Sequence, residues 1–164
     1  VIQPPEIKLQ GWVTHEELRR HGWFFDTAIV EKDTYLAPKG VHPLANDECF
    51  HLRKVGPHHY FIFKWGSSNL GARTKIAIPL SQEMIAKVTS GFKKVVTFVN
   101  TREVFRKDGF ILTRDEIRQL GKFMEVKAPD ANNLYDLAAL AADLGFGAET
   151  IIHESYLRLW LKKR

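Results

Sequence analysis

Basic side chains, with one histidine among them, recur in six separate stretches of this sequence, several of them at two-residue spacing. The stretches contribute Lys8, then His51 with Arg53, Lys64, Arg73 with Lys75, Arg102 with Arg106, and Lys127. In an extended strand every second side chain points to the same face, so each set shares one face of its strand. Arginine offers a two-pronged donor and lysine a point charge, and both bind phosphate oxygens. We interpret the recurrence as a phosphate-binding surface built by several strands.

Two arrangements are compatible with this pattern. If the charged faces point outward, they form an ordinary solvated sheet. If they point inward, like charges are buried together, and this is tolerable only with an anion among them. The opposite faces carry apolar residues such as Ile7, Leu9, Phe61 and Phe105, which helices can cover from outside. The recurrence favours the inward arrangement, a polar tunnel that holds a phosphorylated ligand.

Alternating polarity predicts the strands that position these residues. They are expected over 5–13, 27–37, 48–55, 59–65, 72–80, 93–107, 110–114 and 121–129, with a tight hairpin turn at Asp108-Gly109. Helices are expected over 15–22, after a capping box of Thr14 and Glu17, from Ser81 to about Ser90, over 132–146, and at the C-terminus. We expect an α+β protein in which helices flank an eight-stranded antiparallel β-barrel.

Length and composition limit the class of protein. A chain of 164 residues and 18.9 kDa predicts a single domain over residues 1–164. Cys49 is the only cysteine, which excludes a disulfide within the chain and a cysteine metal cluster, and a reducing cytoplasm is the expected location. No apolar run approaches the roughly 18–20 residues of a membrane span.

The charge balance bears on the partner. A net charge of +5 and a pI near 9.4 favour an anionic partner. The basic residues are not combined with the paired aromatic motifs of an RNA-binding domain. We therefore expect a phosphorylated small molecule as the partner, and neither nucleic acid nor a membrane. A homodimer is an oligomeric state that the sequence leaves open.

Seven motifs follow one another along nearly the whole chain. They are EIKLQ (6–10), KDTYLA (32–37), FHLRK (50–54), FIFKW (61–65), NTREVF (100–105), LTRDEIRQLGKFMEVK (112–127) and SYLRLW (155–160). Their order resembles the CYTH superfamily, the triphosphate tunnel fold of class IV adenylyl cyclases and thiamine triphosphatases. The resemblance implies an eight-stranded tunnel that holds a triphosphate. It further implies that Glu6 and Glu125 bind one or two Mg²⁺ or Mn²⁺ ions, while Arg53, Lys64 and Arg102 bind phosphate.

Five residues depart from the family pattern. Lys8 and Lys127 stand where the family has glutamates, and Gln10 stands where it has a lysine. His51 replaces an arginine, and Asn100 replaces a lysine. Hard cations need several oxygen ligands, and only two of the four expected carboxylates remain. One weak metal site is therefore conceivable, and a tight two-metal site is not.

These residues support three functional hypotheses. The first is a divergent enzyme that hydrolyses or cyclises a triphosphate or an organic phosphate, with altered metal dependence. The second is a catalytically inactive module that binds phosphate or a nucleotide, in which ammonium groups replace the metal. The third is a tunnel used for non-phosphate chemistry. The catalytic candidates are Glu6, Lys8, Lys64, Glu125 and Lys127, and the substrate-binding candidates are His51, Arg53, Lys64, Arg73, Lys75, Arg102 and Arg106.

Overall fold

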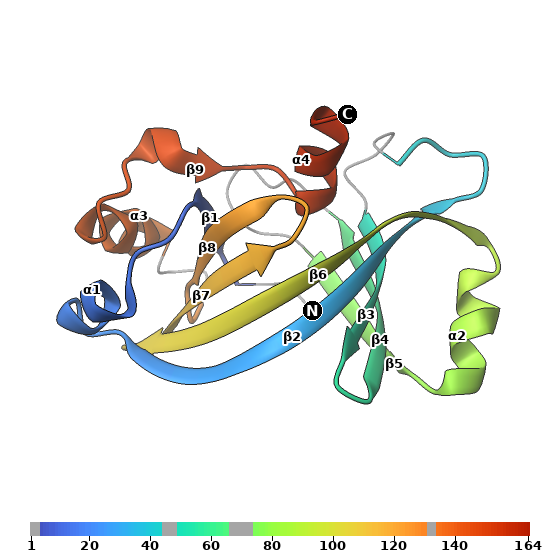
Figure 1. The fold of residues 1–164 in the computed structure, drawn as a ribbon, viewed down its shortest axis with the longest axis horizontal. Helices are drawn as coiled ribbons and strands as arrows, with labels where there is room; N and C mark the ends of the chain where they lie inside the picture. The colour runs from blue at the N-terminus through green and yellow to red at the C-terminus, as the bar shows by residue number, and fades with distance from the viewer. Residues whose placement is uncertain (1–3, 44–48, 66–73, 131–133) are drawn as a thin grey trace.

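One curled antiparallel sheet runs through the protein in the computed structural model, which describes residues 4–43, 49–65, 74–130 and 134–164 (Figure 1). Its strands lie in the order β5-β4-β3-β2-β6-β7-β8-β1-β9, and all neighbours are antiparallel. The strands are β1 (Glu6–Gln10), β2 (Phe24–Pro38), β3 (Cys49–Val55), β4 (His58–Trp65), β5 (Thr74–Leu80), β6 (Phe92–Lys107), β7 (Phe110–Ile117), β8 (Gly121–Lys127) and β9 (Ile151–Ile152). The eight predicted strands are confirmed, and β9 is a two-residue addition. Because β5 and β9 are the edges of the described sheet, it curls without closing into the expected barrel.

The two longest strands, β2 and β6, form a twisted ribbon that crosses the molecule in Figure 1. On one side of this ribbon the sheet continues from β2 through β3 and β4 to β5, and on the other side it continues from β6 through β7, β8 and β1 to β9. Register shifts at Phe25/Thr27 and at Tyr35/Leu36 interrupt the ribbon, and such bulges bend a sheet and increase its twist. As a result, residues of β4 and β5 line the same cavity as residues of β1 and β8.

Several local signals of the sequence are present in the structure. Asp108 and Gly109 have φ angles of 47° and 82° at the β6–β7 turn, and a type I′ hairpin requires positive φ at both positions. Helix α1 (His15–Arg20) begins with the predicted capping box of Thr14 and Glu17. Helix α2 (Gln82–Thr89) begins after Ser81, whose hydroxyl accepts a hydrogen bond from a backbone N–H of the first turn.

The two C-terminal helices cover opposite faces of the curled sheet. Helix α3 (Leu134–Asp143) packs Leu137 into the same apolar cluster as Met124, on the outer face of β8. Helix α4 (Tyr156–Lys162) packs Leu157 into a second cluster with Phe123, which faces the inside of the curl. Since Phe123 and Met124 are consecutive in β8, their side chains point to opposite faces. No helix in the described ranges is both long enough and apolar enough to cross a membrane.

Strand β7 is longer than the sequence pattern predicts. The prediction ended it at Arg114, whereas the structure continues it to Ile117. Asp115 and Glu116 are poor strand formers, so their composition suggested a loop. The fully buried Asp115 instead binds Arg102 on the neighbouring strand, and this tertiary ion pair outweighs its intrinsic preference.

Candidate functional site

A polar cavity, called the tunnel below, lies inside the curl of the sheet. Its empty volume, with the open solvent at its mouths included, is about 710 Å³. Six cationic side chains from six strands line it: Lys8, Arg53, Lys64, Lys75, Arg102 and Lys127. Three carboxylates line it as well: Glu6, Asp33 and Glu125. The charged faces of these strands therefore point inward.

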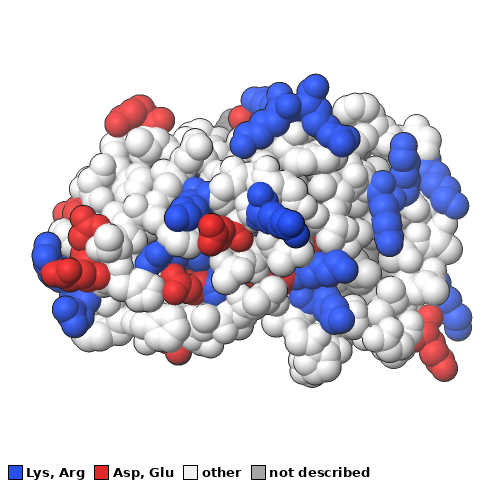
Figure 2. Space-filling model, in the orientation of Figure 1, with Lys and Arg blue, Asp and Glu red and all other residues white. Residues whose placement is uncertain are grey.

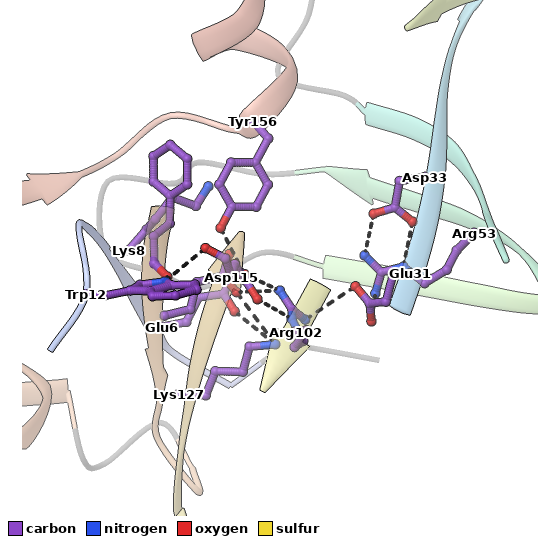
Figure 3. Close-up of polar contacts among 12 residues, drawn as sticks. Glu6, Lys8, Trp12, Glu31, Asp33, Arg53, Arg102, Asp115, Lys127 and Tyr156 are labelled. Carbon is purple, nitrogen blue, oxygen red and sulfur yellow. Dashed lines mark hydrogen bonds and ion pairs between the residues drawn. The ribbon is translucent and has the colours of Figure 1, made fainter. Parts of the chain in front are cut away.

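Arg102 is held by Asp115 at the inner wall of the tunnel (Figure 3). Its Nε and one Nη each donate a hydrogen bond of 2.7 Å to the Asp115 carboxylate. The Tyr156 hydroxyl donates to the same carboxylate over 3.0 Å. Burial alone would lower the pKa of Arg102, but Asp115 and two further carboxylates raise it well above its usual value. This guanidinium is therefore always charged, and a carboxylate of the chain already occupies its two-pronged edge.

Arg53 is bound in the same way by Asp33. Its Nε and Nη2 donate hydrogen bonds of 2.8 Å and 2.7 Å to the two Asp33 oxygens. Glu31 bridges the two arginines, because its carboxylate oxygens lie 3.3 Å from Arg53 Nη1 and 3.7 Å from Arg102 Nη1 (Figure 3). Burial would raise the pKa of Asp33, but the hydrogen bonds from Arg53 lower it below its usual value. Both arginines are thus largely neutralised within the protein.

Four residues form crossed pairs of opposite charge where β1 meets β8. The antiparallel register places Glu6 opposite Lys127 and Lys8 opposite Glu125. Lys127 Nζ lies 3.6 Å from Glu6 Oε2 and 3.9 Å from Glu125 Oε2, so one ammonium group contacts both carboxylates. Burial would raise the pKa of Glu125, but Arg102 and the lysines around it hold that pKa well below its usual range.

Lys8 connects this group to helix α4. Its ammonium donates a hydrogen bond of 2.9 Å to the backbone carbonyl of Glu154 and lies 3.9 Å from the ring centroid of Tyr156, a cation–π contact. Burial lowers the pKa of Lys8, and Glu125 and Glu6 partly oppose this effect.

Lys64 and Lys75 are cross-strand neighbours on β4 and β5, and both line the tunnel. Neither side chain forms an ion pair or a hydrogen bond with another residue of the described part of the chain. Burial lowers the pKa of both, and the nearby Lys64 and Arg53 charges help to bring that of Lys75 down to about 8. These two ammonium groups remain available to an anion.

Two neutral polar side chains in the tunnel also lack protein partners. His51 is 1% exposed and stacks on Tyr35 with ring centroids 4.9 Å apart, and neither of its ring nitrogens has a hydrogen-bond partner among the described residues. Asn100 is 4% exposed, and its side-chain oxygen is likewise unpaired within the described chain. Burial lowers the pKa of His51 to about 3, so its imidazole is neutral near pH 7.

Among the described residues that were predicted to bind the ligand, Arg106 lies outside the tunnel. Its side chain is 59% exposed, and its Nε donates a hydrogen bond of 2.7 Å to Asp26 Oδ2 on β2. The ribbon of β2 and β6 extends beyond the tunnel, and Arg106 lies past the bulge at Phe25/Thr27. Arg106 therefore lies outside the tunnel even though its side chain is on the same face of β6 as that of Arg102. Arg73 lies outside the described residues.

The sequence pattern missed the carboxylates that bind the arginines. Glu31, Asp33 and Tyr35 stand two residues apart on β2, so the spacing that identified the cations also carried this signal. Asp115 was missed because its strand was predicted to end one residue earlier. Tyr156 lies within a recognised motif, but its bond to Asp115 depends on the packing of α4.

A tight Mg²⁺ or Mn²⁺ site does not fit the residues around Glu6 and Glu125. Such ions require several oxygen ligands, and these two carboxylates already contact the Lys127 ammonium. Within the described ranges, no group of three or more His, Cys, Asp and Glu side chains is arranged to hold a metal ion. The predicted weak site at Glu6 and Glu125 would have to displace Lys127 and recruit further ligands.

The outer surface offers a less defined site for anions. On the face in Figure 2, basic and acidic side chains are interspersed, and a group of basic residues lies at the C-terminal end of α4. This face does not carry the continuous basic stripe that is typical of a nucleic-acid-binding surface. The tunnel is therefore the better-defined candidate for an anion site.

Comparisons with known proteins identify a matching family model and similar folds. The CYTH domain family model matches residues 6–156. A Methanocaldococcus jannaschii protein named provisionally as an adenylate cyclase is 23% identical over 155 residues, covering 88% of this chain and 89% of its own. A solved Pyrococcus horikoshii structure has a TM-score of 0.75 at 23% identity, covering 97% of this chain and 99% of its own.

A plant structure resembles the chain over a similar span. A Hippeastrum adenylyl-cyclase-like protein, described as having a dominant triphosphatase activity, has a TM-score of 0.71 at 13% identity. It covers 99% of this chain and 96% of its own. At these identities the structural likeness concerns the fold.

Proposed function

The chain belongs to the CYTH domain family, and we propose that it binds a phosphorylated small molecule in its tunnel, through its own ammonium groups and without a tightly held divalent metal ion. The observation that carries this proposal is the convergence of six cationic side chains from six strands on one cavity. Three of these cations are bound by carboxylates of the chain, whereas Lys64 and Lys75 have no partner in the described residues.

The electrostatics of Lys64 and Lys75 support an anionic ligand. Both ammonium groups are partly buried. Burial lowers the pKa of each, Glu6 partly opposes this effect at Lys64, and the Lys64 charge adds to it at Lys75, so the lowered pKa values reflect the cost of keeping the two groups charged there. An anion between them would remove that cost. Phosphate suits the position because its oxygens accept several charge-assisted hydrogen bonds at once.

The arrangement at the β1–β8 end supports binding without a metal. The Lys127 ammonium supplies positive charge between Glu6 and Glu125, where a divalent ion would otherwise be expected. Lys8 adds a second ammonium group on the neighbouring strand. A metal ion entering this place would meet two like charges and only two carboxylates, so a ligand gains little from bringing one.

A thermal-shift panel tests this proposal. Inorganic phosphate, pyrophosphate, tripolyphosphate, ATP and thiamine triphosphate are each added in EDTA and, separately, with Mg²⁺ or Mn²⁺. A ligand at a hundred times its Kd stabilises the folded state by about 2.7 kcal/mol, which raises the melting temperature by about 5–10 °C in a chain of this size. We expect at least one compound to give this shift equally well in EDTA.

A pair of lysine variants locates the binding. The double variant Lys64→Met/Lys75→Met should lose the shift, and the matched control Lys54→Met, an exposed residue of β3, should keep it. The proposal is wrong if no compound shifts the folded protein, or if every shift requires a divalent metal. The first of these results would favour a tunnel used for non-phosphate chemistry.

Hydrolysis or cyclisation of a triphosphate is a second candidate function. Glu6 and Glu125 remain at the tunnel, and the similar Hippeastrum protein is described as having a dominant triphosphatase activity. Release of phosphate and formation of a cyclic nucleotide are measured with ATP, tripolyphosphate and thiamine triphosphate, each with Mg²⁺ and Mn²⁺. Turnover that Glu125→Gln abolishes supports this function. Absence of turnover by folded protein excludes it for these substrates and leaves the binding function intact.

A further inference from the structure

The charge of the tunnel is already close to balance. Its six lining cations are matched by five carboxylates, namely the three that line the cavity and Glu31 and Asp115, which bind the arginines. A phosphate monoester carries about −1.5 to −2 charges at pH 7, so one such group nearly completes the balance. Three phosphoryl groups without a metal would leave unpaired negative charge in a buried site, which is costly. The charge balance therefore fits one phosphate group.

The position of that phosphate follows from which cations are engaged. The arginines Arg53 and Arg102 each already hold a carboxylate through two hydrogen bonds. Lys127 contacts two carboxylates. The cross-strand pair Lys64 and Lys75 is the place on the tunnel wall where two adjacent ammonium groups lack partners among the described residues.

Beyond this lysine pair the tunnel wall carries neutral polar side chains beside the arginines and their carboxylate partners. Moving across the sheet, β5 and β4 contribute Lys75 and Lys64, β3 contributes His51, and β6, beyond β2, contributes Asn100. Buried polar atoms are nearly always satisfied by protein, water or a ligand. Both ring nitrogens of His51 and the side-chain oxygen of Asn100 have no partner in the described protein, so a ligand can serve them.

The chemistry of these atoms indicates what they would bind. A neutral imidazole presents one donor and one acceptor, and an amide oxygen accepts. A hydroxyl group both donates and accepts, so it satisfies either side chain. A second phosphate would leave the acceptor nitrogen of His51 and the side-chain oxygen of Asn100 unsatisfied, because its oxygens only accept hydrogen bonds.

We propose, resting on the function proposed above, that the tunnel binds a phosphate monoester whose organic part carries hydroxyl groups. The phosphate binds Lys64 and Lys75, and the hydroxyl groups bind His51 and Asn100.

Two three-carbon probes of equal charge test this ligand class. Glycerol 3-phosphate and propyl phosphate differ in two hydroxyl groups, and their affinities for the wild-type protein are measured by calorimetry in EDTA, beside tripolyphosphate. A hydrogen bond between neutral groups contributes about three- to tenfold in affinity. We expect glycerol 3-phosphate to bind at least tenfold more tightly than propyl phosphate, and tripolyphosphate to bind more weakly than glycerol 3-phosphate.

Two variants assign the preference to residues. His51→Phe keeps a ring against Tyr35 but removes both nitrogens, and Asn100→Leu keeps a similar volume without the amide. Each should reduce the preference for glycerol 3-phosphate to about threefold, whereas His58→Phe, at an exposed position, should leave it unchanged. Equal binding of the two monoesters by the wild-type protein overturns this inference without need of any variant.

The remaining outcomes separate the two proposals. If tripolyphosphate binds most tightly in EDTA, the single-phosphate ligand is wrong and the proposed phosphate-binding function stands. If the preference for glycerol 3-phosphate persists in both variants, its assignment to His51 and Asn100 is wrong. If none of the three probes binds, this ligand class is wrong, and the thermal-shift panel above decides whether the proposed function stands.

Discussion

The buried imidazole of His51 makes the stability of the protein depend on pH in a way that one substitution should remove. The ring is 1% exposed and stacks on Tyr35, and its pKa is lowered by burial to about 3 from the usual 6.5. Below pH 6.5 the unfolded chain binds a proton at this histidine, and the folded chain does not until the pH nears 3. The unfolded state therefore gains relative stability as the pH falls through this window.

The size of the effect follows from the two pKa values. Each pH unit within the window contributes about 1.36 kcal/mol. Between pH 7 and pH 4.5 the histidine should lower the free energy of unfolding by about 2.5 kcal/mol. His51→Phe keeps the aromatic stack and removes the titrating group, so its stability should fall by about 2.5 kcal/mol less than that of the wild-type protein over the same interval.

Urea unfolding of the ligand-free protein at pH 7, 6, 5 and 4.5 measures this difference. Other titrating groups are common to both proteins, so the pH dependence of the wild-type-minus-variant difference reports His51 alone. The exposed His58→Phe serves as the matched control and should follow the wild-type curve. The reasoning is refuted if the wild-type and His51→Phe curves stay parallel between pH 7 and pH 4.5.

Three further predictions concern the charged residues. Asp115→Ala removes the carboxylate that accepts two hydrogen bonds from Arg102 and leaves a buried charge uncompensated. Urea unfolding should therefore show a loss of stability of about 3–5 kcal/mol, and a loss below about 1 kcal/mol would contradict this. Lys8→Glu/Lys127→Glu places four carboxylates on two adjacent strands, so Mn²⁺ should raise the melting temperature of this variant and not that of the wild-type protein. An equal response of both proteins would contradict the inference that Lys8 and Lys127 keep a divalent metal out of this position. Phosphate affinity should fall as the pH rises through about 8, because Lys75 loses its charge there, and the affinity of Lys75→Arg should fall less over the same range. A wild-type affinity that does not change between pH 7 and pH 9.5 disagrees with the role given to Lys75.

Much of the fold could be predicted because local patterns and tertiary structure agree. Alternation of polar and apolar residues identified eight strands, and the Asp108-Gly109 turn and the Thr14 capping box marked element ends correctly. Alternation could not predict whether the two edge strands of the sheet pair with each other, because this depends on bulges and on twist accumulated over nine strands. The sheet therefore curls around the tunnel without closing.

The candidate site was predictable in its cations and much less so in their partners. Two-residue spacing assigned Arg53 and Lys64 to inward faces, but it also suggested Arg106, because periodicity along a strand does not report where the cavity ends. The partner of Arg102 is Asp115, thirteen residues away on a strand whose length was underestimated. Ion pairs between strands depend on register, and register cannot be deduced from the pattern of one strand.

A crystal soaked with tripolyphosphate and Mn²⁺ together tests most directly whether the tunnel holds phosphate through its own cations. We predict density for a phosphate group within hydrogen-bond distance, about 2.7–2.9 Å, of the ammonium groups of Lys64 and Lys75. We further predict that Lys127 stays between Glu6 and Glu125 with no metal density there. Mn²⁺ bound by Glu6 and Glu125, or a tunnel without any phosphate while the anion binds elsewhere, would contradict the account.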